Sequence, residues 1–251
     1  MSGPRRATSA SPIFPRSGRC WSAPMRWRWR GTATGSMRSE PILSVIRAYD
    51  DWIVRGYCWG RFWILRQRFL DEIGQYLPER GRVLDVGCGF GLFSLYYASV
   101  RPDLRISGLD RNPRRIAMAR AAATRLGLGR VRYEVGDATE FRGGEIFDAA
   151  YMLDIVHHIP EEAVRPLLEQ LAKALPAGGR LLIKDVDRRP AYKRWFTHAL
   201  DWAMDPRSPV RYWAADELQD LLERIGFRVH RHLMVDILPY PHVLYICERR
   251  P

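Results

Sequence analysis

The middle of the chain alternates short apolar runs with helical stretches, and this alternation constrains the fold more than any other feature of the sequence. Loops containing glycine or proline separate the segments, which favours a parallel sheet covered by helices on both faces. One more helix and two more strands are expected after residue 213. The strands are predicted at 83–86, 104–109, 131–135, 147–152, 180–186, 227–236 and 242–247, and the helices at 92–99, 113–126, 161–175 and 214–225.

The first of these strands runs into a glycine-rich turn, which predicts a ligand site. Gly87, Gly89 and Gly91 allow positive φ angles and let a ligand approach the backbone closely. A dinucleotide fold prefers G-x-G-x-x-G, but Leu92 stands where the third glycine would be. Asp85 precedes the turn, and a carboxylate there would repel a pyrophosphate but suits a cationic sulfonium or ammonium ligand. The turn therefore favours a cationic ligand.

The glycine turn and several later segments together resemble the class I S-adenosylmethionine (SAM)-dependent methyltransferases. The resemblance covers residues 80–249, and its segments occur in the family's order. They are the D-x-G-x-G-x-G turn at 85–91, Asp110 at the end of the second strand, Asp137-Ala138 after the third, Phe147-Asp148 at the fourth, and the segments 154–160 (DIVHHIP) and 175–183 (LPAGGRLLI). The last segment departs from the family pattern, because Ala177 replaces a glycine.

This resemblance implies SAM as the cofactor and a doubly wound α/β fold: a Rossmann-like, mostly parallel sheet of seven strands with an antiparallel last strand and a helical cap. In the family, the acid after the second strand binds the ribose and the D-A pair reads the adenine edge. Asp110 could instead cap the next helix, and Asp137 could serve only its own turn. The expected cofactor-binding residues are Asp85, Gly87, Cys88, Gly89, Gly91, Asp110, Arg111, Asp137, Ala138 and Leu153.

Methyl transfer from a sulfonium requires mainly that a nucleophile be held in line and that water be excluded. A general base assists where the acceptor is a hydroxyl. His157 and His158 follow the fourth strand, and either is a candidate catalytic base, although a structural role is also consistent with the pair. At most one of these adjacent side chains should reach the substrate. No metal is expected, although Asp154, Asp185 and Asp187 occupy suggestive positions.

Aromatic residues are abundant outside the predicted core, in residues 41–77 and 189–213, and they favour a small apolar or aromatic acceptor. Basic residues at 188–194 are candidates to hold an acidic group on it. A nucleic-acid substrate is disfavoured because the N/D-P-P-Y motif is missing. The alternatives are an RNA methyltransferase that uses the basic N-terminal segment, and a SAM-binding regulatory protein without catalysis. The acceptor atom and the oligomeric state are left open.

The sequence predicts three regions. Residues 1–36 hold seven arginines and no acid within a chain of net charge +12, and are expected to be a disordered leader, with Met37 as the native start. Residues 37–79 are expected to form a cap of two helices, the second from Phe62 to Leu77. Residues 80–251 form the core with an aromatic insertion at 189–213. No segment is long and apolar enough to span a membrane, and peripheral contact is left open. The widely spaced cysteines favour a reducing, cytoplasmic location.

Overall fold

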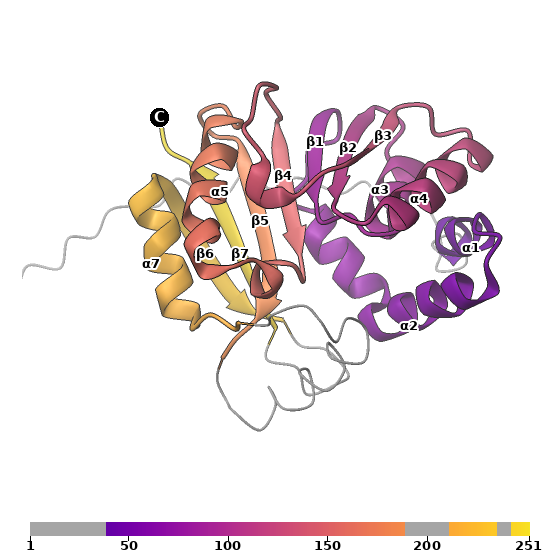
Figure 1. The fold of residues 1–251 in the computed structure, drawn as a ribbon, viewed down its shortest axis with the longest axis horizontal. Helices are drawn as coiled ribbons and strands as arrows, with labels where there is room; N and C mark the ends of the chain where they lie inside the picture. Colours follow the sequence, from indigo (N-terminus) through magenta and orange to yellow (C-terminus); the bar gives the residue numbers. More distant parts are fainter. Residues whose placement is uncertain (1–38, 189–210, 235–241) are drawn as a thin grey trace, which may run out of the picture. The chain divides into compact units, whose positions relative to one another are not determined.

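The computed structural model describes residues 39–188, 211–234 and 242–251, and their centre is a seven-stranded sheet in the order β3-β2-β1-β4-β5-β7-β6 (Figure 1). Six strands run parallel, and only β7 runs against its neighbours β5 and β6. The predicted mostly parallel sheet with an antiparallel last strand is therefore confirmed. The strands are β1 (Gly81–Val86), β2 (Leu104–Asp110), β3 (Val131–Val135), β4 (Ala149–Leu153), β5 (Arg180–Val186), β6 (Phe227–Leu233) and β7 (His242–Arg249).

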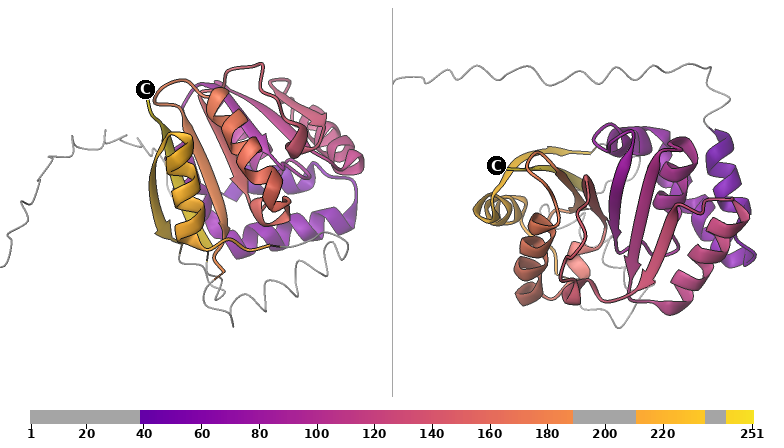
Figure 2. Two further views of the ribbon diagram at one scale, coloured as in Figure 1. Left: turned by 60° about the vertical axis from the view of Figure 1, so that its left-hand side comes forward. Right: turned by 90° about the horizontal axis from the view of Figure 1, so that it is seen from above.

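The sheet is apolar on both faces because successive residues of a buried strand point to opposite sides. Leu182 packs in the cluster formed with α1 (Ser39–Arg47), α2 (Trp52–Gly74), α3 (Leu92–Val100) and α4 (Pro113–Arg125). Its neighbour Ile183 packs in the opposite cluster with α5 (Glu161–Lys173) and α7 (Ala215–Ile225). Figure 2 shows the helices on the two sides of the sheet.

The crossovers change side between β1 and β4, the neighbouring strands at the centre of the sheet. The chain moves outward from β1 through α3 and α4 on one face, and from β4 through α5 on the other. Such a switch point opens a crevice at the carboxyl ends of the strands, which is where open α/β sheets bind ligands. Both halves of the sheet thus direct their loops to this edge.

The N-terminal region contains two helices, as predicted, but the second begins ten residues earlier than expected. α2 starts at Trp52 because the Asp51 carboxylate accepts hydrogen bonds from Ile53 N at 2.7 Å and Val54 N at 3.3 Å. Its inner side contributes buried residues to the core, and Tyr49 Oη, just before it, donates to the Phe90 carbonyl at 2.8 Å. These helices therefore reach the glycine turn of the core.

The remaining boundaries agree with the sequence to within a few residues. β4 begins at Ala149 and not at Phe147, because the Phe147 amide donates to the Ala174 carbonyl at 2.9 Å, beyond the end of α5. α7 ends at Ile225, and the φ of 110° at the following Gly226 is the left-handed conformation expected of a helix stop. Residues 1–36 and most of the aromatic insertion at 189–213 lie outside the described residues, as does the predicted strand end at Asp236.

Candidate functional site

The glycine turn after β1 combines two kinds of glycine. All three glycines have positive φ: 77° at Gly87, 56° at Gly89 and 79° at Gly91. A Cβ on Gly87 would lie 2.1 Å from Ile155 Cδ1, and one on Gly91 would lie 2.3 Å from the Tyr133 hydroxyl. A Cβ on Gly89 would meet no protein atom within 4 Å. Gly87 and Gly91 thus make room for the protein itself, and only Gly89 borders open space.

Asp110, at the end of β2, is fixed beside this open position. One carboxylate oxygen accepts from Gly89 N at 2.9 Å, and the other accepts from Asn112 N at 2.9 Å. The cap of α4 is Asn112, whose side chain accepts from Arg114 N and Arg115 N. Asp110 is therefore not the capping residue of this helix. Each carboxylate oxygen has a second lone pair, so the Asp110 carboxylate can still accept hydrogen bonds from two hydroxyl groups.

Asp85 lies in the interior of the sheet, and only 3% of its surface is exposed. Its carboxyl group accepts a hydrogen bond from the Tyr151 hydroxyl at 2.8 Å. Burial raises the pKa of Asp85 to about 7, although hydrogen bonds from Tyr151 and Ser94 act in the opposite direction. This carboxyl group is thus directed at protein donors, and any effect on a cationic ligand would act at a distance.

The other expected cofactor contacts surround the same edge of the sheet. Cys88 is buried with its sulfur against Gly108, and burial raises the pKa of its thiol, so its backbone is the part available to a ligand. Arg111 is exposed, and Leu153 is buried at the end of β4. Asp137 accepts from Thr139 N at 2.8 Å and starts the short 3-10 helix η1 (Ala138–Glu140). One oxygen of Asp137 therefore serves its own turn, which does not exclude a contact between Asp137 and an adenine.

The two candidate histidines have different surroundings in the 3-10 helix η2 (Val156–His158). His157 is 2% exposed, and its Nδ1 lies 2.5 Å from Asp185 Oδ1, while its backbone amide donates to Asp185 Oδ2 at 3.0 Å. Tyr212 stacks on the His157 ring with centroids 5.5 Å apart. His158 is partly exposed. The sequence did not single out Asp185 as a partner of either histidine.

A second ionic group lies on the opposite face of β5. Lys184 and Arg61 both contact the carboxylate of Asp154, which follows β4 directly. Burial alone would raise the pKa of Asp154, but Lys184 and Arg61 hold it well below its usual range. Sequence reasoning missed Arg61 and Lys184. The available signal was a lysine directly after the apolar run Leu181–Ile183 of β5.

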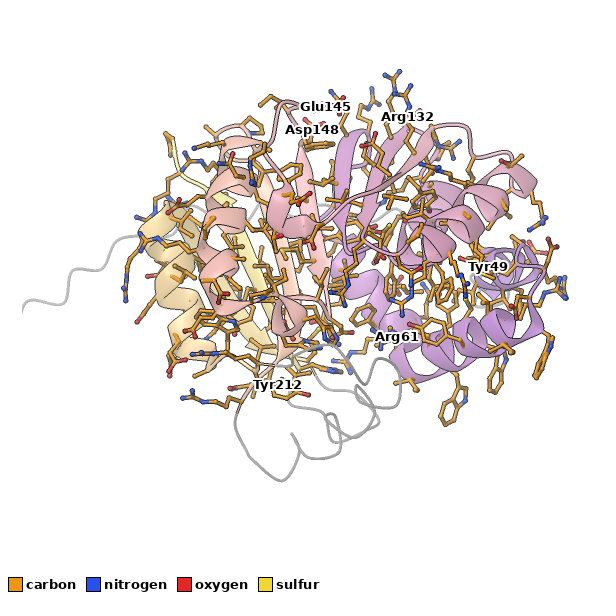
Figure 3. All side chains as sticks on the ribbon, in the orientation of Figure 1. Tyr49, Arg61, Arg132, Glu145, Asp148 and Tyr212 are labelled. Carbon is orange, nitrogen blue, oxygen red and sulfur yellow. The ribbon has the colours of Figure 1, made fainter. Side chains whose placement is uncertain are left out.

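Asp154 and Asp185, two of the carboxylates at positions suggestive of a metal site, do not converge. Asp154 is bound by two cations on the α2 face, whereas Asp185 is bound to His157 on the α5 face. Within residues 39–188, 211–234 and 242–251, no three His, Cys, Asp or Glu side chains are grouped as metal ligands. Figure 3 shows Arg61 and Tyr212 at one edge of the sheet, with Glu145 and Asp148 at the other.

Comparison with known families identifies the family of this chain. A model described as "Methyltransferase domain" matches residues 61–232, which is more than half of the chain. The chain belongs to the methyltransferase-domain family. The resemblance to class I SAM-dependent methyltransferases is thereby confirmed, and SAM is the cofactor of this family.

Curated relatives of this methyltransferase-domain chain carry names of O-methyltransferases. It is 31% identical to "O-methyltransferase cnsE" of Penicillium expansum, over 66% of this chain and 59% of that protein. It is 30% identical to a "Ubiquinone biosynthesis O-methyltransferase" of Cereibacter sphaeroides, over 62% of this chain and 64% of that protein. The chain thus spans less than two thirds of the length of these relatives.

Solved structures support the fold independently. An O-methyltransferase family protein from Burkholderia thailandensis superposes with a TM-score of 0.61 at 20% identity, covering 74% of this chain and 56% of that one. Similarity at this identity concerns the fold alone. In the described helices, none has the length and apolar character that crossing a bilayer requires.

The residues at the glycine turn fit SAM. Gly89 borders space that a side chain would fill, and the neighbouring Asp110 carboxylate retains acceptor capacity for the two ribose hydroxyls. The turn also lacks the third glycine of the G-x-G-x-x-G pattern that lets a pyrophosphate lie on the N-terminus of the next helix, because Leu92 stands there. The local donor and acceptor set therefore suits a nucleoside with a cationic tail better than a dinucleotide.

Proposed function

We propose that this chain transfers a methyl group from SAM to an oxygen atom of a small aromatic or apolar acceptor. The observation that carries the proposal is the Asp110 carboxylate, which Gly89 N and Asn112 N hold beside the open position of the glycine turn. The names of the curated relatives support oxygen as the acceptor atom. The three buried free cysteines among the described residues support a reducing, cytoplasmic location.

Binding of the cofactor is assigned to residues of four strand ends. Asp110 accepts hydrogen bonds from the ribose hydroxyls, and the backbone around Gly89 lies against the methionine part. Asp137 and Ala138 border the adenine, and Leu153 supplies an apolar wall at the end of β4. When bound, SAM supplies an electrophilic methyl group on a sulfonium sulfur. Gly87, Cys88 and Gly91 contribute to the cofactor site through the backbone of the turn. Asp85 acts on the cofactor only at a distance, and Arg111 lies on the exposed side of the site.

We assign the general base to His157 and not to His158. Nδ1–H of His157 donates a hydrogen bond to the Asp185 carboxylate, which leaves the basic lone pair on Nε2. The Asp185 carboxylate also stabilises the imidazolium that forms when His157 takes a proton from an acceptor hydroxyl. His157 thus holds the transferred proton, and Asp185 is its positioning residue.

The test begins with cofactor binding in the full chain. Asp110→Asn should weaken S-adenosylhomocysteine at least about tenfold in calorimetry, because an amide offers only one acceptor oxygen to the two hydroxyls. The matched control is Asp103→Asn, an exposed acid before β2 at the opposite edge, which should bind as wild type does. Equal affinity in the two variants would overturn the ribose assignment.

The second arm is methyl transfer from labelled SAM to a panel of phenols, catechols and hydroxyquinones. Label should appear as an alkali-stable methyl ether, and Asp110→Asn should reduce it. Binding of the cofactor with no transfer to any acceptor would favour the non-catalytic alternative. Label incorporated only into RNA, and lost when residues 1–36 are deleted, would favour the RNA alternative.

A further inference from the structure

α2 is apolar on its outer side as well as on the side that packs in the core. It lies at the periphery of the fold (Figure 1). Its inner side includes Cys58 and Phe62, which are buried in the core. On the opposite side, Trp52, Trp59 and Trp63 are 79%, 58% and 59% exposed. A helix that is apolar on all sides is normally covered, so the outer side of α2 indicates a contact surface.

The exposed residues form a continuous strip along the first three turns of α2. They recur at the helical spacing, which places them on one face of the helix. The members of this outer strip are Trp52, Ile53, Gly56, Trp59, Gly60 and Trp63. The outer strip therefore contains aromatic, aliphatic and glycine residues and no charged residue.

The charged residues that flank the outer strip are directed to other parts of the fold. Arg55 donates hydrogen bonds to the backbone carbonyls of Tyr49 and Arg47, which precede α2. Arg61 contacts Asp154 at the edge of the sheet. A partner that covers the outer strip thus meets no charge of the strip itself, and desolvating a charge is the largest cost of forming an interface.

The outer strip has projections and notches side by side. The rings of Trp59 and Trp63 stack with their centroids 6.4 Å apart and their planes 10° apart, so they project as one unit. A Cβ added to Gly56 or to Gly60 would meet no protein atom within 4 Å. The two glycines therefore leave open notches in the helix surface beside the stacked tryptophans.

The area of the outer strip is sufficient for a dimer. A tryptophan side chain carries about 250 Å² of surface, so the three exposed tryptophans present about 500 Å². Two copies that cover each other's strips would bury about 1,000 Å² from tryptophan alone, which is about the minimum for a specific interface. Ile53, which is 62% exposed, adds to this area.

The outer strip is complementary to itself when two copies of α2 run antiparallel. If the two-fold axis passes between Trp59 and Gly60, residues at equal distances from it along the helix face each other. Trp59 then faces Gly60 of the second copy, and Trp63 faces Gly56 of the second copy. Each tryptophan fills a notch, and each contact occurs twice by symmetry. In a parallel pair, each tryptophan would face its own counterpart and the notches would stay empty.

We infer that the outer strip is the interface of a symmetric homodimer in which two α2 helices pack antiparallel. The partner is a second copy of this chain, because the strip supplies both the projections and the notches that the contact requires. A bilayer surface has no projections that would fill the notches. The inference goes beyond the proposed function and does not depend on methyl transfer.

Filling the notches tests this shape complementarity by sedimentation velocity of the full chain. Wild type should show a concentration-dependent dimer. Gly56→Leu and Gly60→Leu should each weaken it at least about tenfold, because leucine takes the space of the opposing tryptophan. The folded monomer should be at least as stable in urea, since leucine favours a helix more than glycine does and its Cβ meets no protein atom within 4 Å. The control Gly129→Leu, at an exposed turn glycine with equally open surroundings, should dimerise as wild type does.

Removing a projection tests the other half of the contact. Trp63→Ser should weaken the dimer at least about tenfold, because large aromatic residues at the centre of an interface carry most of the binding free energy. The matched control is Leu233→Ser, which removes an exposed apolar side chain from β6 and should leave the dimer unchanged.

Disulfide crosslinking tests the antiparallel register. In a Cys20→Ser background, the double variant Gly56→Cys/Trp63→Cys should form a covalent dimer on mild oxidation, because these positions face each other across the interface. Within one helix they lie about 10 Å apart along the axis, which is too far for a disulfide. Neither single variant should form a covalent dimer.

Three results would overturn the inference. They are a monomer at all concentrations, a dimer as tight in Gly56→Leu and Gly60→Leu as in wild type, and a covalent dimer of Gly56→Cys alone. A monomer that floats with phosphatidylcholine vesicles, and does so more strongly in Gly60→Leu, would assign the outer strip to a bilayer instead. A monomer that does not float would assign it to another segment of the same chain.

Discussion

At the scale of single residues, the environment of each side chain and not its type decides its chemistry. His157 and His158 are adjacent and of the same type, and the Asp185 carboxylate is fixed against both the backbone amide and the Nδ1 of His157. The Asp185 contact selects the tautomer in which Nε2 can accept a proton. Two neighbouring residues of the same type thus have different expected roles.

The residue-scale prediction concerns this pair. His157→Gln should lower kcat for a phenolic acceptor by about 10²-fold near neutral pH, because no base accepts the hydroxyl proton. The deficit should shrink at alkaline pH, where the phenol ionises without help. Asp185→Asn should lower kcat and alter the pH–rate profile with little change in KM, and His158→Gln should leave the profile in place. Wild-type rates from pH 6 to 9 in both His157→Gln and His158→Gln would mean that positioning alone suffices.

At the scale of elements, different glycines of the turn between β1 and α3 serve packing and binding. A side chain at Gly87 would overlap Ile155, whereas one at Gly89 would enter open space beside Asp110. The same residue type is therefore needed at the two positions for different reasons. A glycine-rich motif does not reveal this difference, because the neighbours come from other parts of the chain.

Alanine at each glycine tests the distinction. Gly87→Ala should lower the free energy of unfolding by about 2–4 kcal/mol, since it adds overpacking to an unfavourable φ, and Ile155→Ala should recover part of the loss. Gly89→Ala should cost only about 1 kcal/mol but weaken S-adenosylhomocysteine more strongly than that loss of stability explains. Urea unfolding and calorimetry measure the two effects. Equal stability losses with intact cofactor affinity would contradict the assignment of Gly89 to the cofactor side.

At the scale of the whole molecule, the two core faces meet at one functional edge. Residues of both clusters come from the same strands, so a charge placed inside the sheet affects the stability of the entire fold. Asp85 is such a charge, because it lies in β1 between the two halves of the sheet and is 3% exposed. Its titration should therefore be visible in global unfolding.

The pKa of Asp85 is raised to about 7 from its ordinary 3.8, so the folded chain binds this proton more tightly than the unfolded chain does. Its contribution to stability should be largest below pH 4 and should be lost as the pH rises to 7. Asp85→Asn should remove that dependence and exceed wild-type stability above pH 7, by about 4 kcal/mol at most. Urea unfolding at pH 5, 6, 7 and 8 measures this, with Asp103→Asn as the control. Parallel pH profiles for wild type and Asp85→Asn would refute the assignment.

The sequence by itself determined the order of strands and helices, the glycine turn and the position of Asp110, because these depend on local periodicity and on contacts within one βαβ unit. It placed α2 ten residues too late, because Gly56 and Gly60 obscured a helix whose start depends on the Asp51 cap.

Only the tertiary structure decided which charges meet. Asp185 reaches His157 across 28 residues, and Arg61 reaches Asp154 across 93. Such pairs leave no periodic signal, because they depend on the faces to which neighbouring residues of β5 point and on where α2 crosses the edge of the sheet. The glycine turn and Asp110 can therefore be predicted from local sequence, whereas the contacts of His157 with Asp185 and of Arg61 with Asp154 arise from packing between distant elements.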